Sequence, residues 1–190
     1  DDPASLQPLA RPLLMLEREL LRQYPRQPQV LVQPCGELEL RTVLAARYTS
    51  STVNCWHADD VYIGADLRGV LEILISVLEL RGATVVVESP CDWVILRLLD
   101  CAQVRVIELP LLAGGVIDPQ RLESLLKNEP VRLILLSSAL SMPHGSLLSA
   151  TNRQAIAHLL GCHGTWVLEN DCHSELDEGI DSQRLRDWLD

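Results

Sequence analysis

Phenylalanine is absent from this sequence, and lysine occurs only once in its 190 residues, as Lys127. Aromatic residues make up 4% of the chain and hydrophobic residues 47%, so Leu, Val and Ile must build the core of what is one ordinary domain in size. Acidic residues outnumber basic ones by 26 to 16, which leaves a net charge of −10. Because a nucleic-acid backbone is bound by clustered Lys and Arg, this balance argues against DNA binding by this segment itself.

Long uncharged hydrophobic runs are also missing. The longest apolar stretch, GVLEILISVLEL at 69–80, carries Glu at intervals and is too short and too polar to span a bilayer. No basic stretch followed by an apolar one marks a secretory signal. The opening letters DDPASLQP are typical of a loop, so we expect the sequence to be part of a longer polypeptide. These features predict a cytoplasmic protein with no membrane partner.

The cysteines form no C-x-x-C pair and are expected to be reduced thiols. They stand at positions 35, 55, 91, 101, 162 and 172. A zinc site built from Cys162, His163, Cys172 and His173 is an alternative. Neighbouring Cys and His side chains point in different directions, however, and the usual two-residue ligand spacing is missing. We therefore expect no metal site.

Strand-like and helix-like segments alternate along the chain, which predicts a three-layer α/β/α domain with a mostly parallel sheet, preceded by a helical arm. The expected strands have apolar runs bounded by turn residues; they are 59–64, 83–90, 103–110, 131–138 and 165–170. The expected helices have helical apolar periodicity; they are 5–24, 37–51, 66–82, 92–102, 118–128 and 150–164. The second helix is expected to bury Leu38, Leu40, Val43 and Leu44. Gly82 is expected to close the third helix, and Ser149 to cap the last.

Four polar segments follow the expected strands. They read IGADLRG (63–69), ESPCDW (88–93), SSALSMPHG (137–145) and ENDCHSE (169–175). Ligands of such sheets bind beyond the carboxyl ends of the strands, so these segments should converge. A generic dinucleotide-binding domain is the competing interpretation, but its G-x-G-x-x-G turn is missing. The acidic residues of the last segment, among them Glu169 and Asp171, are expected to form a solvated loop.

In this order and at these separations, the four segments resemble the large domain of fold-type I pyridoxal-phosphate enzymes. They are most similar to the aminotransferase-like domains of MocR-type regulators in the GntR family. The family motifs N-G-A-Q-Q, E-x-P-x-Y, H-Q-F-P-T-G and I-E-D-D-Y-D-S-E-F are matched in turn by 63–67, 88–93, 140–145 and 168–176. The resemblance implies a helical arm or linker over 1–50 and an incomplete large domain over 51–190.

The same resemblance implies where pyridoxal 5′-phosphate would lie. Gly64, Ala65 and Asp66 would form the phosphate turn, although a carboxylate at position 66 would repel the phosphate. Asp92 stands where the family has the aromatic residue that stacks on the pyridine ring. Trp93 follows it, and we expect its indole to pack into the core rather than over the ring.

Asn170 and Cys172 align with the aspartate that keeps the pyridine nitrogen protonated and with the tyrosine that binds the ring hydroxyl. An amide cannot supply the negative charge, and a thiol is a weaker donor than a phenol. The Schiff-base lysine of the family has no counterpart, because Lys127 belongs to an expected surface helix. Cys91, His144 and His173 could be imagined as nucleophile and base, but no spacing pairs them. Catalysis by this chain alone is not expected.

These residues predict the effector-binding and dimerisation portion of a MocR/GntR-type transcription regulator with a degenerate pocket. The resemblance implies a homodimer, an amino-acid-like or B6-vitamer effector, and DNA contact only through an N-terminal winged helix outside this sequence. One alternative is a fragment of a class I/II aminotransferase acting on amino acids, and another is a structural module without a small ligand. In the family's sheet, two further strands separate the first strand from the one that ends at Asn170. The segment at 59–64 is therefore expected either to leave the sheet or to leave an edge that dimerisation covers.

Overall fold

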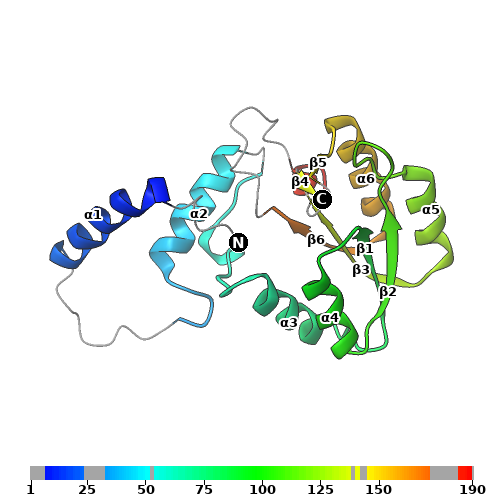
Figure 1. Ribbon diagram of the computed structural model, residues 1–190, viewed down its shortest axis with the longest axis horizontal. Coiled ribbons are helices and arrows are strands. Elements are labelled where there is room, and N and C mark those ends of the chain that lie inside the picture. The colour runs from blue at the N-terminus through cyan, green and yellow to red at the C-terminus, as the bar shows by residue number, and fades with distance from the viewer. Residues whose placement is uncertain are drawn as a thin grey trace.

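The computed structural model describes residues 7–23, 33–51, 54–137, 140–141, 145–171 and 184–189. Its centre is a four-stranded sheet in the order β2-β1-β3-β6 (Figure 1). The strands are β1 (Thr84–Ser89), β2 (Arg105–Pro110), β3 (Val131–Ser137) and β6 (Trp166–Asn170). Every pairing in this sheet is parallel. The expected parallel α/β sheet is therefore confirmed. Two short strands, β4 (Leu140–Ser141) and β5 (Ser146–Leu147), form a separate antiparallel pair.

Helices cover both faces of the sheet and create two hydrophobic cores. The covering helices are α3 (Leu67–Val77), α4 (Trp93–Cys101), α5 (Pro119–Asn128) and α6 (Ala150–His163). Residues of β3 alternate between the cores: Ile134 and Leu136 pack with α5 and α6, whereas Leu133 and Leu135 pack with α3 and α4. Such two-sided burial explains why the β1 and β3 strands have continuous apolar sequences. The three-layer prediction is confirmed.

Each of these helices begins with a side chain that accepts a hydrogen bond from a backbone N–H of its own first turn. The caps are Asp66, Asp92, Asp118 and Ser149. Ser149 Oγ accepts from Asn152 N at 3.2 Å, as the sequence predicted. The third helix ends differently from the prediction: it stops at Val77, and Glu79 takes the left-handed conformation at φ +52°. Gly82, at φ +74°, lies in the following turn instead.

Asn152 joins α6 to the loop before α5. Its Oδ1 accepts from Ile117 N at 3.0 Å, and its Nδ2 donates to Ile117 O at 2.8 Å. Both residues are buried. One amide side chain therefore satisfies both backbone groups of Ile117 in the same way that a neighbouring strand would.

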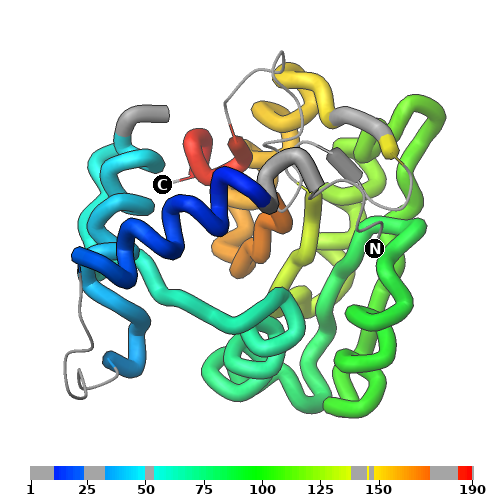
Figure 2. The backbone as a smooth tube through the Cα atoms, turned by 60° about the vertical axis from the view of Figure 1, so that its left-hand side comes forward, coloured from blue at the N-terminus to red at the C-terminus, as the bar shows by residue number. Residues whose placement is uncertain are grey.

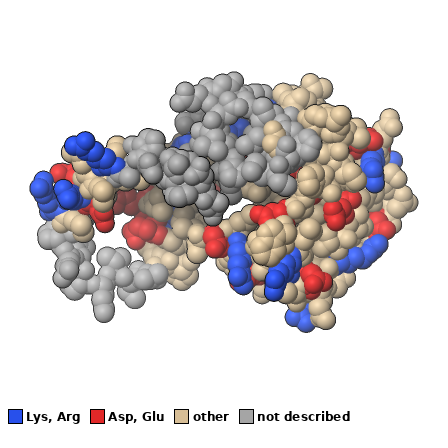
Figure 3. Space-filling model, viewed as in Figure 1, with Lys and Arg blue, Asp and Glu red and all other residues tan. Residues whose placement is uncertain are grey.

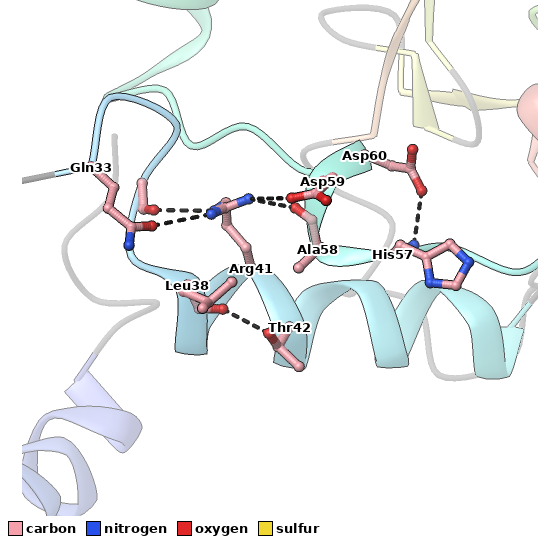
Figure 4. A network of polar contacts seen from close by, with 9 residues as sticks. Gln33, Leu38, Arg41, Thr42, His57, Ala58, Asp59 and Asp60 are labelled. Atoms are coloured by element: carbon pink, nitrogen blue, oxygen red, sulfur yellow. Dashed lines mark hydrogen bonds and ion pairs between the residues drawn. The ribbon is translucent and has the colours of Figure 1, made fainter.

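The second helix, α2 (Leu38–Ser51), buries a face other than the expected one. Leu38, Leu40 and Val43 are exposed, whereas Arg41 and Ala45 are buried. The reason lies in Arg41, a residue that is 7% exposed and whose guanidinium lies at the centre of a polar network (Figure 4). It donates to Gly36 O at 3.1 Å, to Ala58 O at 2.7 Å and to Gln33 Oε1 at 3.1 Å. Because of these bonds, the Arg41 face of the helix is turned toward residues 33–36 and Ala58, and the leucine face is turned outward.

The expected strand at 59–64 is wrong. Ala58–Asp60 form a 3₁₀ turn, η2, and residues 61–64 have no regular structure. Local bonds satisfy this backbone: Ile63 N donates to Cys35 O at 2.9 Å, and Val61 N to Ala58 O at 3.3 Å. Among the described residues, β6 pairs only with β3, and no strand covers its other edge. The sheet thus shows the first of the two expected outcomes, a first strand that has left it.

The expected N-terminal arm is a helix, α1 (Gln7–Gln23), which lies outside the three layers (Figures 1 and 2). Its apolar side chains are exposed; they are Leu13, Leu14, Met15, Leu16, Leu20 and Leu21. No described helix combines the length and the apolar character that a membrane crossing needs. The division of the chain at residue 50 stays a prediction, and the Arg41 bond to Ala58 crosses it.

Candidate functional site

The carboxyl ends of β1, β3 and β6 lie side by side and bring together residues from three of the four polar segments. Ser137 at the end of β3 lies opposite Asn170 at the end of β6. Glu88, near the end of β1, is 3% exposed, and its carboxylate accepts from both the backbone N–H and the hydroxyl of Ser137. Glu88 was not among the predicted site residues. The signal that could have found it is an acidic residue that directly follows the apolar run 85–87 within β1.

The predicted phosphate turn forms an exposed bend before α3. Asp66 has an extended backbone, and its Oδ1 accepts from Gly69 N at 2.7 Å. A Cβ added to Gly64 would lie 2.5 Å from Val70 Cγ2, so the glycine is required by close packing against α3. The turn therefore leads directly into a helix, but the Asp66 carboxylate already accepts a hydrogen bond at the N-terminus of that helix.

Asp92 and Trp93 do not form an aromatic platform. Asp92 Oδ1 accepts from Val94 N at 2.8 Å and caps α4. The expectation that Trp93 packs into the core is wrong, because 68% of this residue is exposed. As the first residue of α4, Trp93 lines a groove of about 600 Å³ between α3 and α4. Arg68 and Arg97 also line this groove, and basic side chains lie over α3 and α4 in Figure 3.

Asn170 is half-buried at the end of β6, and Cys172 lies outside the described residues, as do His144 and His173. Asn170 therefore occupies the predicted strand end, while the ring contacts of both Asn170 and Cys172 stay predictions. Cys162 and His163 end α6 and are exposed. Since Cys172 and His173 are not described, the zinc alternative is not tested.

The acidic residues on either side of Asn170 are not a solvated loop. The Glu169 carboxylate accepts from Leu185 N at 2.7 Å and from Arg186 N at 3.3 Å. Asp171 forms an ion pair with Arg184 Nε at 2.8 Å. The segment 184–189 is thereby held against β6, and the Arg186 guanidinium lies 4.8 Å from the centre of the Tyr48 ring of α2. The earlier interpretation failed because the partners stand well along the chain, at 184–186.

Burial raises the pKa of the Glu169 carboxyl above its ordinary value, against the lowering effect of the two N–H donors. The folded state therefore holds this proton more tightly than the unfolded chain. Its stabilising contribution is complete below the unfolded pKa and is lost as the pH rises through the folded pKa. In Glu169→Gln the contribution disappears. We expect the unfolding free energy of the wild type, relative to this variant, to fall in urea titrations as the pH rises above the ordinary carboxyl value of 4.5.

Glu123→Gln is the matched control for this prediction. Lys127 lowers the pKa of Glu123 through an exposed contact of 2.6 Å on α5, so its contribution has the opposite sign. Relative to Glu123→Gln, the wild type should therefore gain stability as the pH rises. The same trend in both variants would contradict the assignment. The contact also confirms that Lys127 lies on a surface helix.

Cys91 is unsuited to act as a nucleophile. Burial, followed by the charges of Glu88 and Asp92, raises the pKa of its thiol to about 11 from the ordinary 9.0. A shift of this size leaves about a hundredfold less thiolate at neutral pH. We expect iodoacetamide to label Cys91 at least about tenfold more slowly than the exposed Cys101, as followed by peptide mass spectrometry. Equal rates would show that the thiolate at Cys91 is not suppressed.

Taken together, these residues do not fit pyridoxal phosphate. Asp66 is a carboxylate at the phosphate turn, Asp92 caps a helix at the aromatic position, and Asn170 carries no charge for the pyridine nitrogen. The one lysine of the sequence lies on α5. Among the described residues, the arrangement offers hydrogen bonds at the strand ends but no carboxylate at the position of the pyridine-nitrogen partner.

Comparison with known proteins gives two kinds of similarity. No family model matches the chain. It is 27% identical over 143 residues to the uncharacterized HTH-type transcriptional regulator YdcR of Escherichia coli (strain K12). This match covers 75% of this chain and 30% of YdcR. It is 28% identical over 119 residues to YjiR of the same organism, which is also an uncharacterized HTH-type transcriptional regulator. This second match covers 63% of this chain and 25% of YjiR. The chain thus spans less than a third of the length of these curated relatives.

Solved structures with a similar fold include aminotransferases and a lyase. An aspartate aminotransferase from Rhodobacter sphaeroides superposes with a TM-score of 0.78 at 23% identity, over 93% of this chain and 47% of the enzyme. Aminotransferase AspB from Helicobacter pylori 26695 gives 0.73 at 16%, over 91% and 46%. The PLP-bound C-S lyase from Staphylococcus hominis gives 0.67 at 11%, over 84% and 41%. The chain therefore has the fold of part of an aminotransferase, as its four segments predicted.

Proposed function

We propose that this chain is the effector-binding and dimerisation module of a DNA-binding transcription regulator of the MocR/GntR type, located in the cytoplasm. The observation that carries the proposal is a pairing of two similarities. Its sequence is similar to HTH-type regulators over most of its length, while its fold is that of an aminotransferase. A regulator that contains an aminotransferase-like domain accounts for both.

The site residues support a regulatory role over a catalytic one. An amide at position 170 and a helix cap at position 92 remove two contacts that an electron-sink mechanism uses. A fragment of an aminotransferase acting on amino acids is the second candidate, and the likeness to aspartate aminotransferases favours it. A regulator needs only differential binding of an effector to two states of the protein, which the strand-end site can supply without a covalent anchor.

DNA contact is assigned to a part of the polypeptide outside this sequence. The net charge of −10 opposes binding to a phosphate backbone. On the face that Figure 3 shows, basic and acidic side chains alternate over the described residues, and no continuous basic surface forms. The homodimer and an amino-acid-like or B6-vitamer effector belong to the same proposal, and light scattering of the complete protein tests the first.

The deciding experiment compares the complete polypeptide encoded by the gene with the 190-residue chain. In gel-shift titrations against DNA from upstream of its own gene, the complete protein should bind with an affinity that falls steeply with salt, and the chain should not bind. Incubation of the complete protein with amino and keto acids should give no transamination. Brisk turnover without DNA binding would establish the aminotransferase alternative.

A further inference from the structure

The N-terminus of α3 is closed by the chain itself. Asp66 Oδ1 lies 2.7 Å from Gly69 N, so this carboxylate takes one of the N–H donors that the first turn of a helix offers to an anion. The bond is exposed, and the backbone of Asp66 is extended at φ −162°. A phosphate ester at this turn would need the same donors and would face a negative charge already in place.

The neighbouring helix repeats the arrangement. Asp92 caps α4 through Val94 N at 2.8 Å, at the position that the resemblance aligns with the family's ring-stacking aromatic residue. The indole next to it lines the groove along α4, with Arg97 and Leu98. Two of the contacts implied for the cofactor, the phosphate turn and the ring platform, are thus replaced by carboxylates that serve the helices.

We infer that this chain has exchanged the phosphate-binding turn for a self-capped one, and that Asp66 excludes pyridoxal phosphate and other phosphate esters from this end of α3. The inference rests on the geometry of the turn and not on the regulator assignment. Under it, an effector of the site lacks a phosphate group at this position. A B6 vitamer is then bound only in its unphosphorylated form.

The test uses pyridoxine 5′-phosphate and pyridoxine as probes. Neither carries an aldehyde, so Lys127 cannot form an imine with them, and calorimetry reads reversible binding alone. The 190-residue wild type should show no binding of the phosphate ester up to about 1 mM. Asp66→Asn removes the charge but keeps the cap, since asparagine caps as well as aspartate. Asp66→Gly removes both the charge and the side-chain cap, and glycine is well tolerated at the N-cap position.

The affinity for the phosphate ester should increase from the wild type to Asp66→Asn and again to Asp66→Gly. The glycine variant should gain at least about tenfold in this affinity, and its affinity for pyridoxine should not change. Asp118→Gly is the matched control, because Asp118 caps α5 through Gln120 N at 3.0 Å in the same way. Circular dichroism confirms that each variant is folded.

Three results would overturn the inference: wild-type binding of the ester with a Kd below about 1 mM, no gain in either Asp66 variant, or an equal gain in Asp118→Gly. None of them bears on the DNA-binding experiment, so the regulator assignment stands or falls separately.

Discussion

Arg41→Ala is expected to lower the stability of α2 against the rest of the chain by about 3 kcal/mol. The substitution leaves two carbonyls, Gly36 O and Ala58 O, without the guanidinium that now donates to them. Hydrogen bonds that involve a charged group contribute more than neutral ones, and their loss at a buried position is costly. Amide hydrogen exchange in residues 38–51 and 56–61 should accelerate about a hundredfold, which is the factor that this free energy corresponds to.

Glu39→Ala on the same helix is the control. Glu39 is exposed, and alanine is a good helix former, so the change should stay within about 0.5 kcal/mol. Arg41→Lys keeps the charge but loses the planar fork, and it should behave like the alanine variant. If lysine restored wild-type exchange rates, charge alone would hold α2 in place and the three-way hydrogen bonding would be unimportant.

Asn152→Ala is expected to destabilise the α5–α6 side of the domain by about 2–4 kcal/mol. The substitution leaves both backbone groups of Ile117 buried without the amide that now satisfies them, at 3.0 and 2.8 Å. The side chain is itself 8% exposed, so water cannot easily replace it. Urea unfolding followed by tryptophan fluorescence measures the effect as a lower midpoint at unchanged slope.

The same substitution at an exposed asparagine calibrates this result. Asn128 Nδ2 donates to Ser124 O at 2.7 Å on the surface of α5, where water can take over the bond. Asn128→Ala should therefore change the unfolding free energy by less than about 0.5 kcal/mol. Similar losses in both variants would mean that the Ile117 contacts contribute nothing beyond helix capping and propensity.

Local signals carried most of the fold prediction. The runs VVV (85–87) and LILL (133–136) are apolar at every position because both of their faces are covered, and they were readable as buried strands. Ser149 stands one residue before a helical pattern and caps it as expected. The strand ends followed from these elements, since parallel strands point their carboxyl ends to one edge of the sheet.

Two failures concern residues whose partners lie far along the chain, and a third concerns a local helix cap. Hydrophobic periodicity put the leucines of α2 inside, but a single arginine bonded to Ala58 decides which face is buried. Residues 61–64 have an apolar strand-like pattern, but Ile63 N bonds to Cys35 O instead of to a strand. Trp93 was placed in the core by residue type alone. The helix cap at Asp92 fixes where α4 begins and turns the next side chain outward.

The Arg41 network has a mechanical consequence. It fastens the start of α2 to residues 58–60, and Ile63 is bound to Cys35, one residue before the left-handed Gly36. Both contacts join the N-terminal end of α2 to residues 58–64, the segment that leads into α3. A displacement of α2 would therefore move the start of this segment with it, through one guanidinium and one backbone hydrogen bond.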